Sequence, residues 1–305
     1  MRDQGIKSRT KPILSLMIVA LAALPSVAFA QLQAGPLRVM KISDNFYWTV
    51  GGTGENTGII IGSTGVIVVD TKTTEDSAKA VLGEIAKITN KPVDTVILTH
   101  SDHLRGLAAL PAGVAIIAQE NCKKEMEASR ARDAAPADRM PTRTIGKDET
   151  LTIDGVRVRL LNFGPAHTAG DLTVYFPDLK AVFTGDLVVT DRAPDDTPIH
   201  EAMQGSVKGW FNNVRGMLAL DATTYVLGHG ESLFSKDDVK KKVALIQAKW
   251  DKIQALAEQG KSLTEIKAAL GEPTAAAVPN AQGNLPEPTL TELIYKELKE
   301  KAITN

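Results

Sequence analysis

The stretch of sequence that decides the fold is Thr95-Val-Ile-Leu-Thr-His-Ser-Asp-His-Leu-Arg-Gly106. It begins with a short apolar run of the kind that forms a buried strand, and it continues into a turn that holds two histidines and an aspartate. Loops that follow strands bring polar side chains from separate elements together, so binding groups are common there. Three later segments have the same character: Gly164-Pro-Ala-His-Thr-Ala-Gly-Asp171, Val182-Phe-Thr-Gly-Asp186 and Gly228-His-Gly230.

The histidines of the chain gather in these turns. Of the five in the whole sequence, four are His100, His103, His167 and His229. Imidazole and carboxylate groups are the usual ligands of zinc and similar ions where thiolates are absent. The sequence has a single cysteine, Cys122, which excludes an intramolecular disulfide and a Cys-x-x-Cys zinc motif. The turns therefore indicate a metal site.

Strand-like and helix-like segments alternate on both sides of these turns. Strands are predicted at Leu37–Ile42, Phe46–Val50, Thr57–Ile61, Val66–Asp70, Thr95–Leu98, Val114–Ile117, Val156–Leu161, Leu172–Phe176, Ala181–Thr184 and Thr224–Leu227. Helices are predicted at Thr74–Thr89, Asn121–Ala128, Val207–Leu220, a long stretch around Val239–Ala257, and Leu290–Lys301. The polar stretch Ser129–Arg143, which two prolines interrupt, is predicted to be a loop. Two similar halves without a low-complexity linker favour a single α/β domain.

The first thirty residues have the features of an export signal. A basic start precedes the apolar run Ile13–Leu24, and the segment ends in Ala28-Phe-Ala30, which is typical of a signal-peptidase site. The apolar run is too short to span a bilayer, which takes about 20 residues. We therefore expect residues 1–30 to be a signal peptide and residues 31–305 to be one domain with C-terminal helices. The mature protein is expected to be periplasmic or secreted, without a stable membrane anchor.

The charge balance narrows the class of partner. The chain has 35 basic and 36 acidic residues, which gives a formal net charge of −1. A protein that binds nucleic acid by neutralising phosphates would be more basic. We therefore expect a small-molecule substrate and no nucleic-acid partner, and we leave the oligomeric state open.

Taken together and in this order, the four segments resemble the motifs of the metallo-β-lactamase superfamily. Members carry His-x-His-x-Asp-His, then Gly-x-x-His-Thr-x-Gly, then Gly-Asp after a strand, then a Gly-His-Gly-like turn. The resemblance covers nearly all of the chain after residue 30 and implies an α/β fold of four layers, an αββα sandwich with metals at one edge. It also implies one or two Zn²⁺ ions held by six residues. These metal ligands are His100, Asp102, His103, His167, Asp186 and His229.

The first motif departs from the family pattern because it is two residues short. His100-Ser-Asp-His103 stands where six residues are usual, so one histidine of the motif is absent. Either Leu98 replaces the first family histidine, or His100 is the first and the shortened turn has lost the second. Both readings leave one ligand of the usual two-metal site unfilled. Asp70, at the end of an apolar strand, also resembles an acid of the family, although a solvated turn aspartate explains it equally well.

The resemblance implies a hydrolase in which a metal-bound hydroxide attacks an ester, thioester, lactone or lactam carbonyl. It gives Asp102 a catalytic role, either as a ligand of a second ion or as the group that orients the nucleophile. An aspartate at position 186, where a cysteine marks many true β-lactamases, ranks β-lactams below other carbonyl substrates.

Two alternatives to this hydrolase stay open. The first is a mononuclear iron oxygenase of the same fold that acts on a sulfur compound, with Fe²⁺ held by two histidines and one carboxylate. His100, His167 and Asp186 would supply that set. The second is a non-catalytic binding protein that has lost its metal. His200 could line the substrate cleft from the loop after Asp186, but it is interpreted as a surface or locally hydrogen-bonded histidine, and Cys122 is interpreted as a partly buried thiol.

Overall fold

The computed structural model describes Met1 and residues 35–102, 104–129, 138–275, 278 and 286–303. The fold belongs to a compact unit that begins at Ala34. Apart from Met1, the expected signal peptide lies outside the described residues, and the domain boundary at residue 31 stays a prediction. Within the described ranges, no helix combines the length and the apolar composition that crossing a membrane requires.

The described part of the chain contains two β-sheets. The first has seven strands in sequence order, antiparallel from β1 to β4 and parallel from β4 to β7. Its strands are β1 (Arg38–Ser43), β2 (Phe46–Val50), β3 (Thr57–Ile61), β4 (Val66–Val69), β5 (Val93–Ile97), β6 (Ala115–Gln119) and β7 (Arg143–Ile145). The second has five strands in the order β12-β11-β10-β9-β8, and only β11 and β12 pair in parallel. Its strands are β8 (Asp148–Ile153), β9 (Val156–Leu161), β10 (Thr173–Phe176), β11 (Ala181–Phe183) and β12 (Thr224–Val226).

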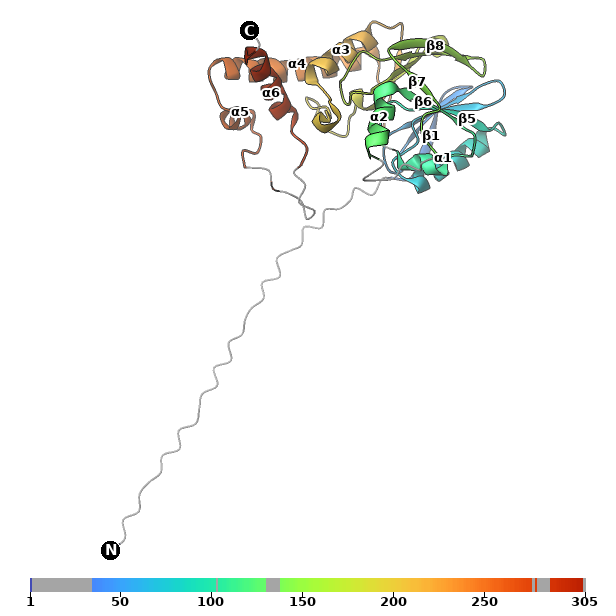
Figure 1. Cartoon of the computed structure of the whole chain (residues 1–305), viewed down its shortest axis with the longest axis horizontal. Coiled ribbons are helices and arrows are strands. Elements are labelled where there is room, and N and C mark those ends of the chain that lie inside the picture. Colours follow the sequence, from blue (N-terminus) through green and yellow to red (C-terminus); the bar gives the residue numbers. More distant parts are fainter. Residues whose placement is uncertain (2–34, 103, 130–137, 276–277, 279–285, 304–305) are drawn as a thin grey trace. The chain divides into compact units, whose positions relative to one another are not determined.

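Helices cover the outer faces of both sheets. They are α1 (Glu75–Ile88), α2 (Glu120–Ser129), α3 (Val207–Leu218), α4 (Lys236–Glu258), α5 (Leu263–Leu270) and α6 (Leu290–Ile303). Apolar side chains of α1 and α2 pack with one face of the first sheet, and those of α3 to α6 pack with the second. Helices α4, α5 and α6 lie against one another (Figure 1).

A third apolar cluster fills the space between the two sheets. It joins Phe46 and Ile67 of the first sheet to Val174, Phe176 and Phe183 of the second, all of them buried. Burial on both faces explains why these strands read as continuous apolar runs in the sequence. Helix, sheet, sheet and helix therefore follow in four layers, and the predicted αββα sandwich is confirmed.

The sequence prediction missed two strands and one helix. Strands β7 and β8 contain mostly exposed or half-buried side chains at the edges of their sheets, so they lack the apolar run that marked the other strands. Helix α5 begins at a capping box in which Ser262 and Glu265 bond each other's backbone N–H groups. That Ser-x-x-Glu pattern is a helix-start signal that was visible in the sequence.

The two sheets pack closely against each other at Gly58 of β3. A Cβ atom on this residue would overlap the ring of Phe183 in β11. We expect Gly58→Ala to lower the free energy of unfolding by about 1–3 kcal/mol, because overpacking forces neighbouring side chains out of place. The melting temperature would fall by roughly 2–10 °C, measurable by circular dichroism.

Gly83 of α1 provides the matched control for this substitution. No atom lies within 4 Å of a Cβ built on it. Gly83→Ala should raise stability by up to about 1 kcal/mol, because alanine has the higher helix propensity. A Gly58→Ala protein that melts no lower than the wild type would contradict the close packing of the sheets.

Candidate metal centre

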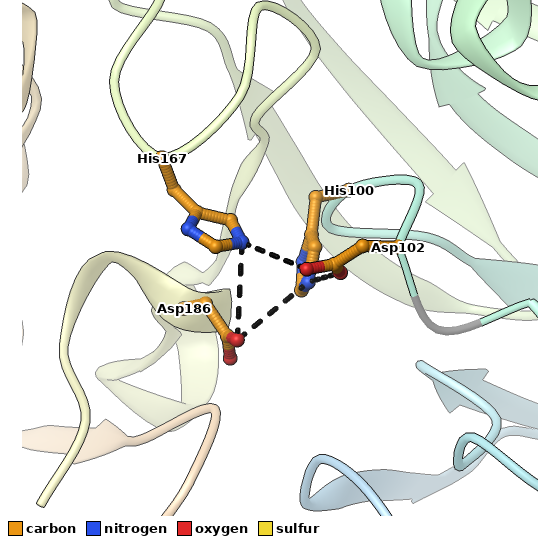
Figure 2. A group of neighbouring side chains, drawn as sticks. All are labelled: His100, Asp102, His167 and Asp186. Carbon is orange, nitrogen blue, oxygen red and sulfur yellow. Dashed lines mark hydrogen bonds and ion pairs between the residues drawn. The ribbon is translucent and has the colours of Figure 1, made fainter. Parts of the chain in front are cut away.

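Predicted site residues from separate strand ends meet at one edge of the sandwich. His100 and Asp102 follow β5, His167 lies between β9 and β10, and Asp186 follows β11. One ligand atom of each lies within 4.8 Å of one ligand atom of every other (Figure 2). His229, after β12, joins this group through its Nε2 atom, which lies 3.3 Å from Asp186 Oδ2. The sixth predicted ligand, His103, lies outside the described residues.

Small residues allow the strand ends to come this close. Gly185 has a φ of +50°, and a Cβ atom there would press against the Thr99 hydroxyl. A Cβ atom on Gly228 would overlap Asp186 and the backbone of Gly185. Both turns therefore require glycine, one of them for conformation as well as for space.

The turn that carries His167 is closed by a buried carboxylate. Asp171 accepts hydrogen bonds from the Thr168 N–H at 3.1 Å and from the Thr168 hydroxyl at 2.7 Å. The Asp171 backbone carbonyl also accepts a bond from Asn162 Nδ2. These bonds fix the loop at the residue next to His167, which is why the Gly-x-x-His-Thr-x-Gly-Asp segment forms a rigid turn.

The outer nitrogen of each central imidazole is held by a hydrogen-bond acceptor. His167 Nδ1 lies 3.0 Å from the carbonyl oxygen of Pro198, which can only accept, so Nδ1 carries the proton. His100 Nδ1 lies 2.8 Å from the Thr99 hydroxyl, which in turn donates to Asp70 at 2.7 Å. Because the hydroxyl proton is used in that second bond, its oxygen accepts from His100. Both rings therefore present Nε2 to the centre.

The Nε2 atoms face carboxylate oxygens. His167 Nε2 lies 3.1 Å from Asp102 Oδ2 and 3.9 Å from Asp186 Oδ2. His100 Nε2 contacts Asp102 Oδ1 and lies 3.8 Å from Asp186 Oδ2. A neutral imidazole with its proton on Nδ1 has only a lone pair at Nε2. The Nε2 lone pairs therefore face the lone pairs of the carboxylate oxygens, which is unfavourable without a cation. A cation must lie between them, either a proton or a metal ion.

The donor set fits a metal ion of the zinc or iron class. It consists of imidazole nitrogens and carboxylate oxygens, with no thiolate, as such ions commonly use. His100, His167 and Asp186 are buried, so their orientation is maintained by packing. The described part of the centre can therefore hold a metal cofactor.

The charges of the centre stabilise one another. Burial alone would lower the pKa of His100, but the adjacent carboxylates of Asp102 and Asp186 raise it well above its usual range. Burial would raise the pKa of Asp102, but the neighbouring histidines lower it well below its usual range. Asp102 is therefore ionised at neutral pH, as a ligand or a proton acceptor must be.

Leu98 bears on the question of which histidine the shortened motif has lost. Its side chain is buried in the apolar cluster beneath α1 and α2, outside the group of ligand atoms. Position 98 is therefore not a vacant ligand position. The structure favours the reading in which His100 is the first histidine of the motif and the turn after it has lost the second.

Asp70 is a buried partner of the centre and not a solvated turn residue. Its carboxylate accepts bonds from the Thr99 N–H at 2.8 Å and the Thr99 hydroxyl at 2.7 Å. Burial raises the pKa of Asp70 to about 7. Through Thr99 it determines which nitrogen of His100 carries the proton.

His200, which the sequence analysis left out of the predicted ligands, lies beside the centre. Its ring packs against the ring of His167, with 4.5 Å between centroids, and its Nε2 lies 3.0 Å from Asp102 Oδ2. Only 23% of the side chain is exposed. No strand precedes His200, so the pattern that identified the other histidines did not apply to it. The scarcity of histidine in the chain was the one available signal.

The comparisons with known proteins agree with this geometry. A sequence model described as the metallo-beta-lactamase superfamily matches residues 50–229, a span that contains every residue of the centre. The chain is 34% identical over 189 residues to the 2,4-dinitroanisole O-demethylase subunit alpha of Nocardioides sp. (strain JS1661), covering 60% of this chain and 54% of that protein. It is 31% identical over 147 residues to the hydroxyacylglutathione hydrolase of Brucella anthropi, covering 45% and 47%.

A solved structure, the metallo-beta-lactamase from Pontibacter korlensis, superimposes with a TM-score of 0.59 at 22% identity. The match covers 70% of this chain and 99% of that one, and at this identity it shows the fold alone. The chain spans about half the length of the curated relatives it matches. The family model covers more than half of the chain and agrees with the fold and the order of the site residues, so the chain belongs to the metallo-beta-lactamase superfamily.

Proposed function

We propose that this protein is a metal-dependent hydrolase, with zinc as its cofactor, that cleaves an ester, thioester, lactone or lactam carbonyl. The observation that carries the proposal is the convergence of imidazole Nε2 atoms on the carboxylates of Asp102 and Asp186. One of the relatives of the chain is named as a hydrolase, which supports the reaction type.

The residues of the centre divide the work of such a reaction. His100, His167 and His229 would hold the metal with Asp186, the carboxylate that all three of these rings face. A bound zinc ion lowers the pKa of a coordinated water to about 7 and polarises the carbonyl under attack. Asp102 stays ionised at neutral pH, so its Oδ2 atom can accept the proton of the attacking water or orient that water.

Metal removal provides the direct test. Stripping the purified full-length protein with a chelator should abolish hydrolysis and lower the melting temperature. A ligand present at 100 to 1,000 times its dissociation constant stabilises by roughly 2.7–4.1 kcal/mol. For a domain of this size, its removal corresponds to a fall of about 5–15 °C. Plasma mass spectrometry would count the ions, and differential scanning fluorimetry would follow unfolding before and after zinc is restored.

Full activity and an unchanged melting temperature in the metal-free protein would contradict the proposal. An unchanged melting temperature in a protein that lacks hydrolase activity both with and without metal would favour a binding protein of this fold.

One observation favours a second candidate, a mononuclear iron oxygenase that acts on a sulfur compound. His100 Nε2 and His167 Nε2 lie 3.8 and 3.9 Å from the same oxygen of Asp186, which makes a group of two histidines and one carboxylate. That set is typical of Fe²⁺ sites with open coordination positions. Bound iron together with thiol-dependent oxygen uptake would favour the oxygenase, whereas bound zinc without oxygen uptake would exclude it.

A further inference from the structure

The fifth histidine of the chain is built into the centre by its backbone as well as by its ring. The N–H of His200 donates to the carbonyl oxygen of His167 at 2.8 Å, and the N–H groups of Met203 and Gly205 donate to the His200 carbonyl. These bonds hold the loop after β11 against the turn that carries His167. His200 is therefore held in a fixed position next to the centre.

The ring of His200 has the same two-sided arrangement as the rings of the predicted ligands. Its Nδ1 atom lies 3.3 Å from Glu287 Oε2, and its Nε2 atom lies 3.0 Å from Asp102 Oδ2. A histidine that binds a metal almost always donates its other N–H to a carboxylate or carbonyl. The Glu287 carboxylate is the acceptor next to Nδ1 of His200, as the Pro198 carbonyl is the acceptor next to Nδ1 of His167.

The positions of the histidines relative to Asp102 and Asp186 show what His200 adds to the centre. His100 and His167 lie between the carboxylates and contact both. His229 extends this group at Asp186, and His200 extends it at Asp102, at 3.3 and 3.0 Å. The centre therefore has an imidazole at each end. The imidazole at the Asp102 end belongs to a loop that is distant from the shortened turn in the sequence but contacts it in the fold.

We propose that His200 is a metal ligand at the Asp102 end of the centre and supplies the imidazole that the shortened turn has lost. The inference rests on the proposed function, because it presupposes that the centre binds a metal. If His200 is a ligand, it replaces the histidine that the short motif lacks, and the centre keeps a second metal position, at Asp102. Asp102 and His200 would be its described protein ligands, and His167, whose Nε2 atom has one lone pair, would stay with the ion at Asp186.

The test is a metal titration of the full-length chain and its His200→Ala variant. Zinc stoichiometry would be measured by plasma mass spectrometry, affinity by competition with a chromophoric chelator, and coordination by the visible spectrum of the Co²⁺ form. We expect His200→Ala to lose one ion per chain, or to bind it more than about 100-fold more weakly, since loss of an outer partner alone costs 10–100-fold. The Co²⁺ spectrum should change as a ligand is lost.

Two further variants control the experiment. Lys296→Ala removes an exposed ion pair to Glu201, next to His200, without touching the centre, and should bind metal as the wild type does. Glu287→Gln weakens the support of the His200 ring and should lower affinity at one position by about 10-fold, without removing a ligand. It keeps the inference testable if His200→Ala does not fold.

Two results would overturn the inference, and they are distinguishable. A wild-type chain that binds metal while His200→Ala keeps its stoichiometry, affinity and Co²⁺ spectrum would remove His200 from the ligand set and leave the proposed function intact. A wild-type chain that binds no metal would overturn the proposed function and this inference together.

Discussion

Replacing His167 with alanine is expected to lower hydrolytic turnover by roughly 1,000-fold or more. His167 Nε2 lies 3.1 Å from Asp102 and 3.9 Å from Asp186, so the substitution removes the imidazole donor that lies between the two carboxylates of the centre. A catalytic metal contributes several kcal/mol to stabilising the transition state. Each 1.36 kcal/mol corresponds to a tenfold change in rate, and a loss of about 4 kcal/mol gives the expected factor.

The measurement combines steady-state kinetics on a panel of ester, thioester and lactone substrates with metal analysis of the same samples. Asp191→Asn is the matched control, because this half-exposed carboxylate lies 3.8 Å from His229 Nδ1, outside the central group. Its loss should cost no more than about 10-fold, the lower end of the range for outer partners of a ligand. If His167→Ala is folded and keeps both metal and turnover, the assignment of His167 to the centre is wrong.

The order of the four motifs was enough to predict the fold and to single out residues that the structure brings together. Strands such as β5 and β10 are buried on both faces, and that burial is recorded in the sequence as a continuous apolar run. The polar groups that follow such runs lie at sheet edges, so His100 and Asp186 could be identified one at a time. The sequence thus predicted the buried strands and the polar residues at their ends, because burial on both faces requires a continuous apolar run.

The rest of the site depends on contacts that leave no local pattern. His200 belongs to an irregular loop, and only the fold brings that loop against Asp102. The role of Leu98 was also open in the sequence, because a side chain after a strand can face either the centre or the outer core. Cys122 shows the same limit: it was expected to be partly buried, but it is a fully buried residue of α2, and burial raises the pKa of its thiol.

Substitution of Asp70 is also expected to have a large effect. Two different substitutions at this position separate the effect on stability from the effect on metal binding. Its backbone has a φ of +58°, and its carboxylate accepts two buried bonds from Thr99. Asp70→Ala removes both bonds and leaves a buried N–H without its acceptor, at about 1–3 kcal/mol for each group. It also places alanine in a left-handed conformation, which costs about 1–2 kcal/mol. Burial raises the pKa of Asp70 to about 7, so its carboxylate is partly protonated at neutral pH and accepts weaker bonds, and we therefore expect the lower part of the combined range, about 3–4 kcal/mol.

Asp70→Asn should keep the stability that alanine loses and still weaken metal binding. Asparagine tolerates the positive φ, and its side-chain oxygen can accept from the Thr99 N–H. Its amide nitrogen, however, would donate to the Thr99 hydroxyl, which would then turn its own proton toward His100 Nδ1. That moves the imidazole proton to Nε2, the atom that must bind the metal, and should lower affinity by 10–100-fold. Chemical denaturation and zinc titration of both variants would measure the two effects. An Asp70→Asn protein with wild-type zinc affinity would show that Thr99 does not set the proton position of His100.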